Sequence, residues 1–312
     1  MIPKIIFFGT PNFAVQLLDQ INKRQYLIDA VVTSSDKKSG RGRKLKSSAV
    51  KDYCVVKNIT LYQPENLKEE SFVSKIKKHN SDMFVVVAYR MLPKVIWSIP
   101  RLGTFNLHAS LLPNYRGAAP INWVIINQER ITGVTTFLID ESIDTGKILL
   151  KSEYRMNTNE TYDTLHDNLL KIAKPLIINT INNLYHNKTF PKKQINNFKL
   201  APKLTKENTR VNWNDPLDKI VSFINGLNSY PGAWSQIIEN KIINTFKIFE
   251  IEYEYTNHEY DLNKLIVVDK KIKISHKEGF LIINSLQLPN KKKLSDKQLL
   301  NGYSFKKDVF VQ

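Results

Sequence analysis

The sequence predicts an α/β protein with a doubly wound, mainly parallel sheet, followed by a small β-barrel. Residues 4–8, 13–21 and 30–33 have the patterns of a strand, a helix and a second strand, which is the opening of a parallel sheet. Residues 83–88 form a continuous apolar run, typical of a central strand buried on both faces. Beyond residue 230, apolar and polar residues alternate in several short segments, which indicates the antiparallel strands of a barrel.

Apolar spacing predicts the helices of the first half of the chain. Phe13, Leu17 and Ile21 recur at helical spacing after a turn at residues 9–11. That turn lacks the Gly-x-Gly-x-x-Gly pattern, so the sequence does not support a dinucleotide site. Further helices are predicted at residues 51–57, 72–79 and 121–127.

The second half of the chain changes character after one long helix. Residues 161–186 carry a stripe of leucine and isoleucine at helical spacing. The following segment is polar, basic and interrupted by prolines, which indicates a linker. A short helix is predicted at residues 216–225. We therefore predict an N-terminal domain over residues 1–187, a basic linker over 188–206 and a C-terminal domain over 207–312.

One predicted strand carries two polar side chains on one face. Asn106 and His108 alternate with Phe105 and Leu107, and successive side chains of a strand point to opposite faces. The chain then turns at residues 110–113. An amide donor beside a titratable donor at a strand end could stabilise a developing oxyanion. The alternative, for such a pair taken alone, is an asparagine and a histidine that only cap a strand.

A carboxylate could complete this pair. Residues 133–139 are rich in β-branched and aromatic residues and predict a strand, with a loop at residues 140–146 at its end. Asp144 in that loop could orient His108 and favour its charged form. Alternatively, the acidic residues of the loop are solvated turn formers.

Composition points to an anionic partner and a reducing compartment. The 46 Lys and Arg residues against 29 Asp and Glu give a net charge of +17. The chain is also rich in Lys, Asn and Ile, so some lysines can be neutral surface residues. Its one cysteine, Cys54, allows no intramolecular disulfide. With no apolar run of membrane-spanning length and no signal peptide, we expect a cytoplasmic protein.

The most basic segment is the loop at residues 34–48. Its cations form an electrostatic footprint for phosphates, and Gly40 and Gly42 permit a close approach to a nucleic-acid backbone. The alternative is a solvated flexible loop. The six cations are Lys37, Lys38, Arg41, Arg43, Lys44 and Lys46.

The motifs together resemble the signature of the folate-dependent formyltransferases. The resemblance rests on Asn106-x-His108, on Ser-Leu-Leu-Pro-x-Tyr-Arg-Gly-Ala-Ala-Pro at residues 110–120, and on Asp144-Thr-Gly. It extends over nearly the whole chain. Two segments resemble the corresponding segments of those family members that act on methionyl-tRNA. They are Gly-Arg-Gly-Arg-Lys-Leu at residues 40–45 and Lys-Leu-Thr-Lys-Glu at residues 203–207. Other matching stretches are residues 8–14, 85–89 and 230–234.

The resemblance implies transfer of the formyl group of 10-formyltetrahydrofolate to the amino group of initiator methionyl-tRNA, for translation initiation. It implies catalysis by Asn106, His108 and Asp144, with no metal, by a monomer whose C-terminal OB-like barrel binds tRNA. The six histidines also lack metal-ligand spacing. The implied folate contacts are Tyr89, Arg90, Met91, Leu92, Ser110, Leu111, Leu112 and Pro113. The implied tRNA contacts are Lys37, Lys38, Arg41, Arg43 and Lys44.

Arg90 and a shortened loop around it depart from the family pattern, which usually has a glycine there and one more residue.

Three other functions remain as alternatives. A sugar-nucleotide N-formyltransferase shares the catalytic set and the architecture, but not the Gly-Arg-Gly-Arg-Lys loop. Glycinamide ribonucleotide formyltransferase generally lacks the long C-terminal domain. A non-catalytic RNA-binding protein would explain the charge, but not Asn106, His108 and Asp144 together.

Overall fold

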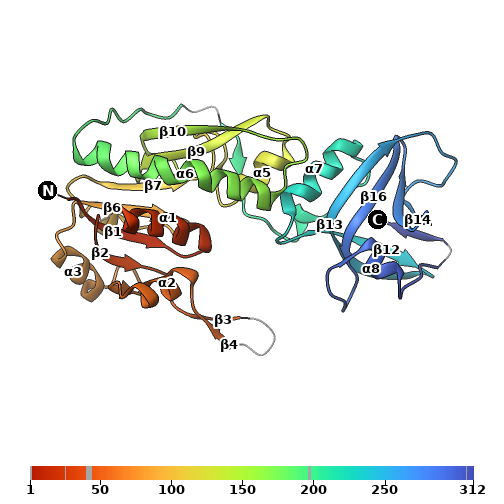
Figure 1. The fold of residues 1–312 in the computed structure, drawn as a ribbon, viewed down its shortest axis with the longest axis horizontal. Coiled ribbons are helices and arrows are strands. Elements are labelled where there is room, and N and C mark those ends of the chain that lie inside the picture. Colours follow the sequence, from red (N-terminus) through yellow and green to blue (C-terminus); the bar gives the residue numbers. More distant parts are fainter. Residues whose placement is uncertain (1, 25, 40–43, 196–197, 307) are drawn as a thin grey trace. The chain divides into compact units, whose positions relative to one another are not determined.

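The computed structural model describes residues 2–24, 26–39, 44–195, 198–306 and 308–312 (Figure 1). It confirms the predicted fold class, with an α/β unit and a β-barrel unit. The first compact unit consists of Met1–Gly117, Ile131–Arg155 and Asp167–Leu200. The second consists of Ala118–Arg130, Met156–His166 and Ala201–Gln312. Each unit is therefore assembled from segments that are not consecutive in the sequence.

The first unit contains a seven-stranded sheet in the order β10-β9-β7-β6-β1-β2-β5. The run from β5 to β7 is parallel, and β9 and β10 are antiparallel to their neighbours. The strand order reverses between β1 and β6, where doubly wound sheets bind ligands at their carboxyl ends. The strands are β1 (Lys4–Gly9), β2 (Leu27–Val32), β5 (Leu61–Tyr62), β6 (Met83–Val87), β7 (Thr104–His108), β9 (Ile131–Leu138) and β10 (Ile148–Arg155).

Helices cover both faces of this sheet. Phe72 and Ile76 of α3 and Ile96 of α4 pack in one apolar cluster with alternate residues of the strands, such as Phe8 and Phe84. The intervening strand residues are also buried, and α1 contacts β1 and β6. The helices are α1 (Asn12–Lys23), α2 (Ala49–Lys57), α3 (Glu70–Lys78), α4 (Lys94–Trp97) and the long α6 (Tyr162–Tyr185). None of the helices in the described part of the chain is long and apolar enough to cross a membrane.

The second unit is a barrel packed against α5 (Pro120–Ile126) and α7 (Leu217–Leu227). Its strands run in the order β13-β12-β18-β14-β15-β16, and pairing of β13 with β16 closes the ring. Phe246, Ile272 and Ile283 pack in its core with Ile224 of α7. The elements are β12 (Ala233–Glu239), β13 (Ile242–Tyr255), β14 (Lys264–Val268), β15 (Lys271–His276), β16 (Gly279–Gln287), β17 (Leu294–Ser295), α8 (Asp296–Leu300) and β18 (Val309–Val311).

Two predicted irregular segments have more structure than the sequence indicated. The basic loop contains an antiparallel hairpin of β3 (Lys37–Ser39) and β4 (Lys44–Lys46). The linker segment pairs with β10 at Lys192, and the first unit extends to Leu200. The remaining short elements are β8 (Arg116–Gly117), β11 (Leu200–Ala201) and the 3-10 helix Glu207–Thr209.

Candidate active site

Asn106 and His108 lie on β7, as predicted, and face the same side because strand side chains alternate. In the sheet register, Asn106 is opposite Phe137 and His108 is opposite Thr135 of β9. His108 is buried, with 6% of its surface exposed. The Oδ1 atom of Asn106 is also buried and has no hydrogen-bond partner among the described residues. Because buried amide atoms are rarely left unpaired, this side chain is a candidate for contact with a substrate.

The two ring nitrogens of His108 face two different oxygen atoms. Nε2 lies 2.7 Å from the carbonyl oxygen of Tyr115, and a carbonyl can only accept, so Nε2–H donates this bond. Nδ1 lies 3.7 Å from Oδ2 of Asp144, an ion-pair distance that is too long for a hydrogen bond. The ring is therefore held through Nε2, and Nδ1 is the nitrogen left for a further partner beside a carboxylate.

Asp144 is placed by the backbone around it. Its Oδ2 accepts a hydrogen bond of 2.9 Å from the backbone N–H of Gly117, in the loop that follows β7. Asp144 itself has a left-handed backbone conformation, with φ of 55°. Two residues on, a Cβ atom at Gly146 would lie 1.6 Å from the carbonyl oxygen of Leu138, so only glycine fits this close approach. The structure thus brings Asn106, His108 and the Asp144 loop into one site.

A buried threonine that the sequence reasoning missed holds the predicted folate loop. The Thr135 hydroxyl donates to the carbonyl oxygen of Ser110 at 2.7 Å and accepts from the N–H of Leu112 at 3.1 Å. Ser110 in turn donates to the carbonyl oxygen of Asn114 at 2.6 Å. In the sequence, Thr135 is one of several β-branched residues of a strand, and nothing marks it as different from the others.

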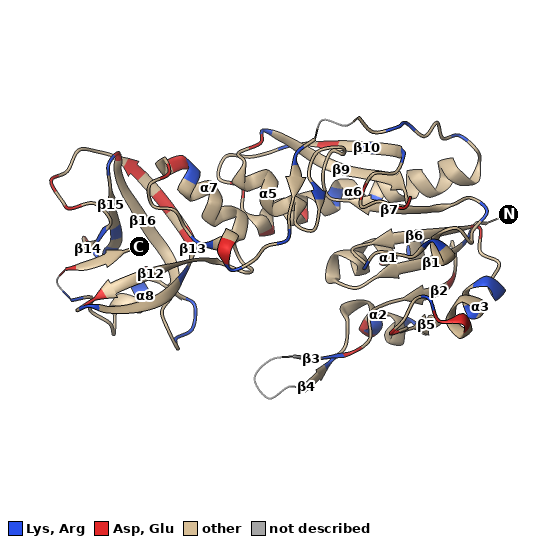
Figure 2. Ribbon diagram, turned by 180° about the vertical axis from the view of Figure 1, so that it is seen from behind, with Lys and Arg blue, Asp and Glu red and all other residues tan. Residues whose placement is uncertain are grey.

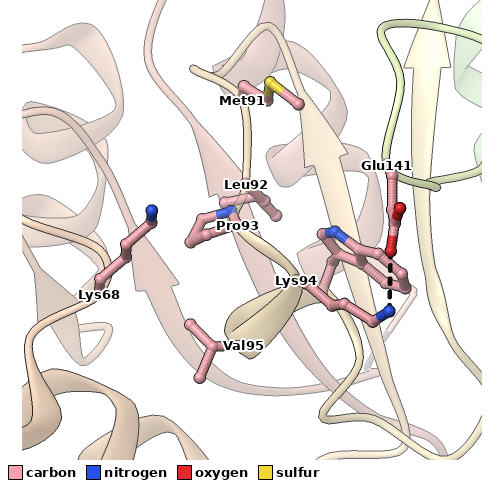
Figure 3. A pocket seen from close by; sticks show the side chains of 8 residues that line it. Lys68, Met91, Leu92, Pro93, Lys94, Val95 and Glu141 are labelled. Atoms are coloured by element: carbon pink, nitrogen blue, oxygen red, sulfur yellow. Dashed lines mark hydrogen bonds and ion pairs between the residues drawn. The ribbon is translucent and has the colours of Figure 1, made fainter.

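An open hollow of about 410 Å³ lies beside the loop that follows β6 (Figure 3). Two of the predicted folate contacts, Met91 and Leu92, line it, together with Lys68, Pro93, Lys94, Val95, Trp97 and Glu141. Its lining is mainly apolar, and Lys94 forms a 2.8 Å ion pair with Glu141 at its edge. Such a surface suits the face of a planar, partly aromatic ligand.

The other predicted folate contacts do not line this hollow. Arg90 donates to the backbone carbonyl oxygens of Pro64 and Glu65, at 2.6 and 2.8 Å. Tyr89 packs against Phe8, and burial raises the pKa of its phenol. The Tyr89 hydroxyl is buried and has no hydrogen-bond partner in the described ranges. The loop at residues 110–113 is part of the site through its connection to His108, rather than through the hollow.

The β3–β4 hairpin is fixed at its base by one acidic residue. Asp36 accepts from Lys51 of α2 at 2.6 Å and from the Gln63 amide at 2.8 Å, and the bond from Lys51 lowers the pKa of the Asp36 carboxyl. Lys37 and Lys46 pair across the hairpin, and both are exposed. Figure 2 shows the cations of the described ribbon in blue and the acidic residues in red. Lys38 and Lys44 lie on the same two strands, whereas Arg41 and Arg43 lie outside the described residues.

The side chains that commonly bind metals are dispersed. Within the described ranges, no group of three or more His, Cys, Asp or Glu side chains is arranged to hold a metal ion.

Comparison with known proteins identifies the class. Residues 3–181 match the formyl transferase family model, and residues 203–304 match the formyl transferase C-terminal domain. The chain belongs to the formyl transferase family.

Within this family, the chain is similar over almost its whole length to methionyl-tRNA formyltransferases. It is 47% identical to that of Flavobacterium johnsoniae, over 99% of this chain and 98% of the relative. It is 42% identical to the methionyl-tRNA formyltransferase of Bacteroides thetaiotaomicron, over 96% of this chain and 95% of the relative.

Solved structures share the fold at lower identity. The sugar 3N-formyl transferase WlaRD, determined in the presence of dTDP and 5-N-formyl-THF, superposes with a TM-score of 0.63 at 22% identity, over 94% of this chain and all of that chain. HypX from Aquifex aeolicus in complex with tetrahydrofolic acid superposes with a TM-score of 0.67 at 17% identity, over 96% of this chain. The match covers 47% of the HypX chain, so this chain spans about half the length of HypX. These likenesses concern the fold.

Substitution of Thr135 by valine tests how firmly the loop at residues 110–113 is held. Valine keeps the shape but leaves the Ser110 carbonyl and the Leu112 N–H without their partner, which costs roughly 1–3 kcal/mol per buried group. For the two groups together, we expect the free energy of unfolding in urea to fall by roughly 2–6 kcal/mol. Thr135→Ser, which keeps the hydroxyl, is the control. Equal losses in both variants would show that the methyl group, and not the hydrogen bonds, matters.

Proposed function

We propose that this protein transfers a formyl group from 10-formyltetrahydrofolate to the amino group of initiator methionyl-tRNA, and that it does so in the cytoplasm, where translation starts. The observation that carries the proposal is the position of His108 between the Tyr115 carbonyl and Asp144, with Asn106 on the same face of β7. The near full-length similarity to methionyl-tRNA formyltransferases supports the choice of acceptor.

The proposed chemistry uses two hydrogen-bond donors and one carboxylate. Negative charge develops on the formyl oxygen when the amine attacks the formyl carbon. We assign the Asn106 amide and Nδ1–H of the protonated His108 ring to stabilise that charge, since Nε2 is already bound to Tyr115. Asp144 stabilises the charged ring and accepts the proton that the amine loses. The bond between the formyl carbon and the folate nitrogen then breaks, and that nitrogen leaves with one proton in exchange for the formyl group.

The residues around the site fit a reduced folate. The folate supplies a formyl carbon bound to nitrogen, which is already an activated acyl group. The apolar hollow at Met91, Leu92, Val95 and Trp97 can receive a planar ring. The loop at residues 110–113 frames the reacting centre from the side of His108.

The net charge of +17 and the β3–β4 hairpin support a nucleic-acid acceptor. We propose that Lys37, Lys38, Lys44 and Arg43 contact phosphates, and that Arg41, between two glycines, reads the end of the acceptor stem. The C-terminal barrel is proposed to hold the rest of the tRNA. A sugar nucleotide would need neither the hairpin nor this charge.

The acceptor can be tested directly with a labelled formyl donor. We expect formyl transfer to methionyl-tRNA and, at equal concentrations, no comparable transfer to an amino-sugar nucleotide. The amino-sugar nucleotide is the informative competitor because WlaRD shares this fold. Faster transfer to the sugar nucleotide would overturn the proposed acceptor while leaving the formyltransferase chemistry in place.

Substitution of either oxyanion donor should lower turnover strongly. We expect Asn106→Ala and His108→Ala each to reduce kcat by roughly 100- to 1000-fold, because each removes one donor from the developing charge. Circular dichroism and the urea midpoint should show that both variants remain folded. A folded variant with near-normal kcat would contradict the role given to that residue.

Removal of the hairpin lysines should weaken tRNA use without affecting the folate. For Lys37→Ala combined with Lys44→Ala, the slope of log(kcat/KM) against log[salt] should become shallower by about 1 for each phosphate that the variant no longer binds. The KM for the folate should not change. Lys75→Ala, an exposed lysine of α3, is the control. An unchanged salt slope in the double variant would mean that the hairpin does not contact the tRNA.

A further inference from the structure

Gln194 belongs to none of the sequence motifs of the family and lies in the segment predicted as a linker. Its side-chain amide nevertheless makes four hydrogen bonds within the first unit. Nε2 donates to the backbone carbonyl oxygens of Asp144 and Gly146, at 2.9 and 2.8 Å. Oε1 accepts from Nε and Nη2 of Arg116, at 3.1 and 2.7 Å. All donors and both lone pairs of the amide are therefore used.

The orientation of this amide is unambiguous. Carbonyl oxygens can only accept and a guanidinium can only donate, so exchanging the oxygen and nitrogen of Gln194 would break every one of the four bonds. Arg116 is itself buried, with 8% of its surface exposed, and its guanidinium lies 4.1 Å from the centroid of the Phe198 ring. The residue that holds Gln194 is thus fixed by packing as well as by hydrogen bonds.

The two carbonyls that Gln194 binds belong to Asp144 itself and to Gly146, two residues further along the same loop. Strand β9 runs antiparallel to β7 and ends at Leu138, which is level with Phe105, three residues before His108. The loop after β9 must therefore fold back by roughly 10 Å to bring Asp144 to His108, at about 3.3 Å per residue. The Gly117 N–H holds the Asp144 carboxylate, and Gln194 holds the backbone at Asp144 and at Gly146 shortly after it.

We infer that Gln194 is a positioning residue for the proposed formyl transfer. It fixes the backbone of Asp144 so that the carboxylate faces Nδ1 of His108, and Arg116 fixes Gln194 in turn. The inference rests on the function proposed above for Asp144. It gives the segment around residue 194 a part in catalysis in addition to its part in connecting the two units.

The test compares Gln194→Ala and Gln194→Glu with wild type. We expect kcat for methionyl-tRNA to fall roughly 10- to 100-fold in Gln194→Ala, because an error of about 1 Å in a catalytic group costs this much. The KM for the folate should stay close to wild type. Gln194→Glu should be impaired as strongly, since its carboxylate would face the two carbonyls and could not donate to them. Ile195→Ala, at the exposed neighbouring residue, is the control.

A double-mutant cycle distinguishes positioning from general stability. In an Asp144→Asn background, Gln194→Ala should lower kcat by less than about twofold, because the two residues act as one unit. Wild-type kcat in Gln194→Ala, or losses that multiply in the double variant, would overturn the inference. So would a loss of activity that only follows the unfolded fraction measured by circular dichroism.

The proposed function can fail separately from this inference. If wild type formylated an amino-sugar nucleotide instead of methionyl-tRNA, the same cycle would be run with that acceptor. If Gln194→Ala then lowered kcat little in the Asp144→Asn background, the positioning role of Gln194 would hold with the different substrate. If the two losses of kcat multiplied, that role would be overturned for either acceptor.

Discussion

The antiparallel pairing of β9 with β7 is the constraint on which the site depends. It places Thr135 opposite His108 and Phe137 opposite Asn106, and a slip of one residue would turn both polar side chains of β7 to the other face. The same pairing carries the chain away from the site before Asp144 is reached. The β7–β9 register thus fixes where His108 lies and also creates the need to bring a carboxylate back to it.

Several acidic residues of this strongly basic chain have fixed partners. Asp36 and Asp144 each face two or more groups that are themselves fixed, such as Lys51 and the Gly117 N–H. On the barrel, Glu250, Glu252 and Glu254 alternate along β13 and each has a partner side chain on a neighbouring segment. These five carboxylates therefore position cations and hydrogen-bond donors, while the excess of Lys and Arg gives the chain its net positive charge.

Sequence patterns predicted the parts of the molecule that repeat a simple rule. The buried strand β6, the helix periodicity of α1 and α6 and the shared face of Asn106 and His108 all follow from local spacing. The pattern could not show that β9 is antiparallel to β7, because orientation depends on the whole sheet. It also could not separate Thr135 and Gln194 from their neighbours, since their contacts span 25 and 48–50 residues of sequence.

Arg90 is another residue whose hydrogen-bond partners could not be predicted from the sequence. A charged residue in a loop at a strand end is a reasonable candidate for ligand contact, yet its guanidinium is bound to the Pro64 and Glu65 carbonyls. Both of these groups lie on the loop after β5, the edge strand of the parallel sheet. Arg90 thereby joins two loops at the carboxyl edge of the sheet, and Met91 and Leu92 are left to face the hollow. The resemblance implied Arg90 as a folate contact; in the structure its hydrogen bonds help to shape an apolar surface of the kind that suits a planar ring.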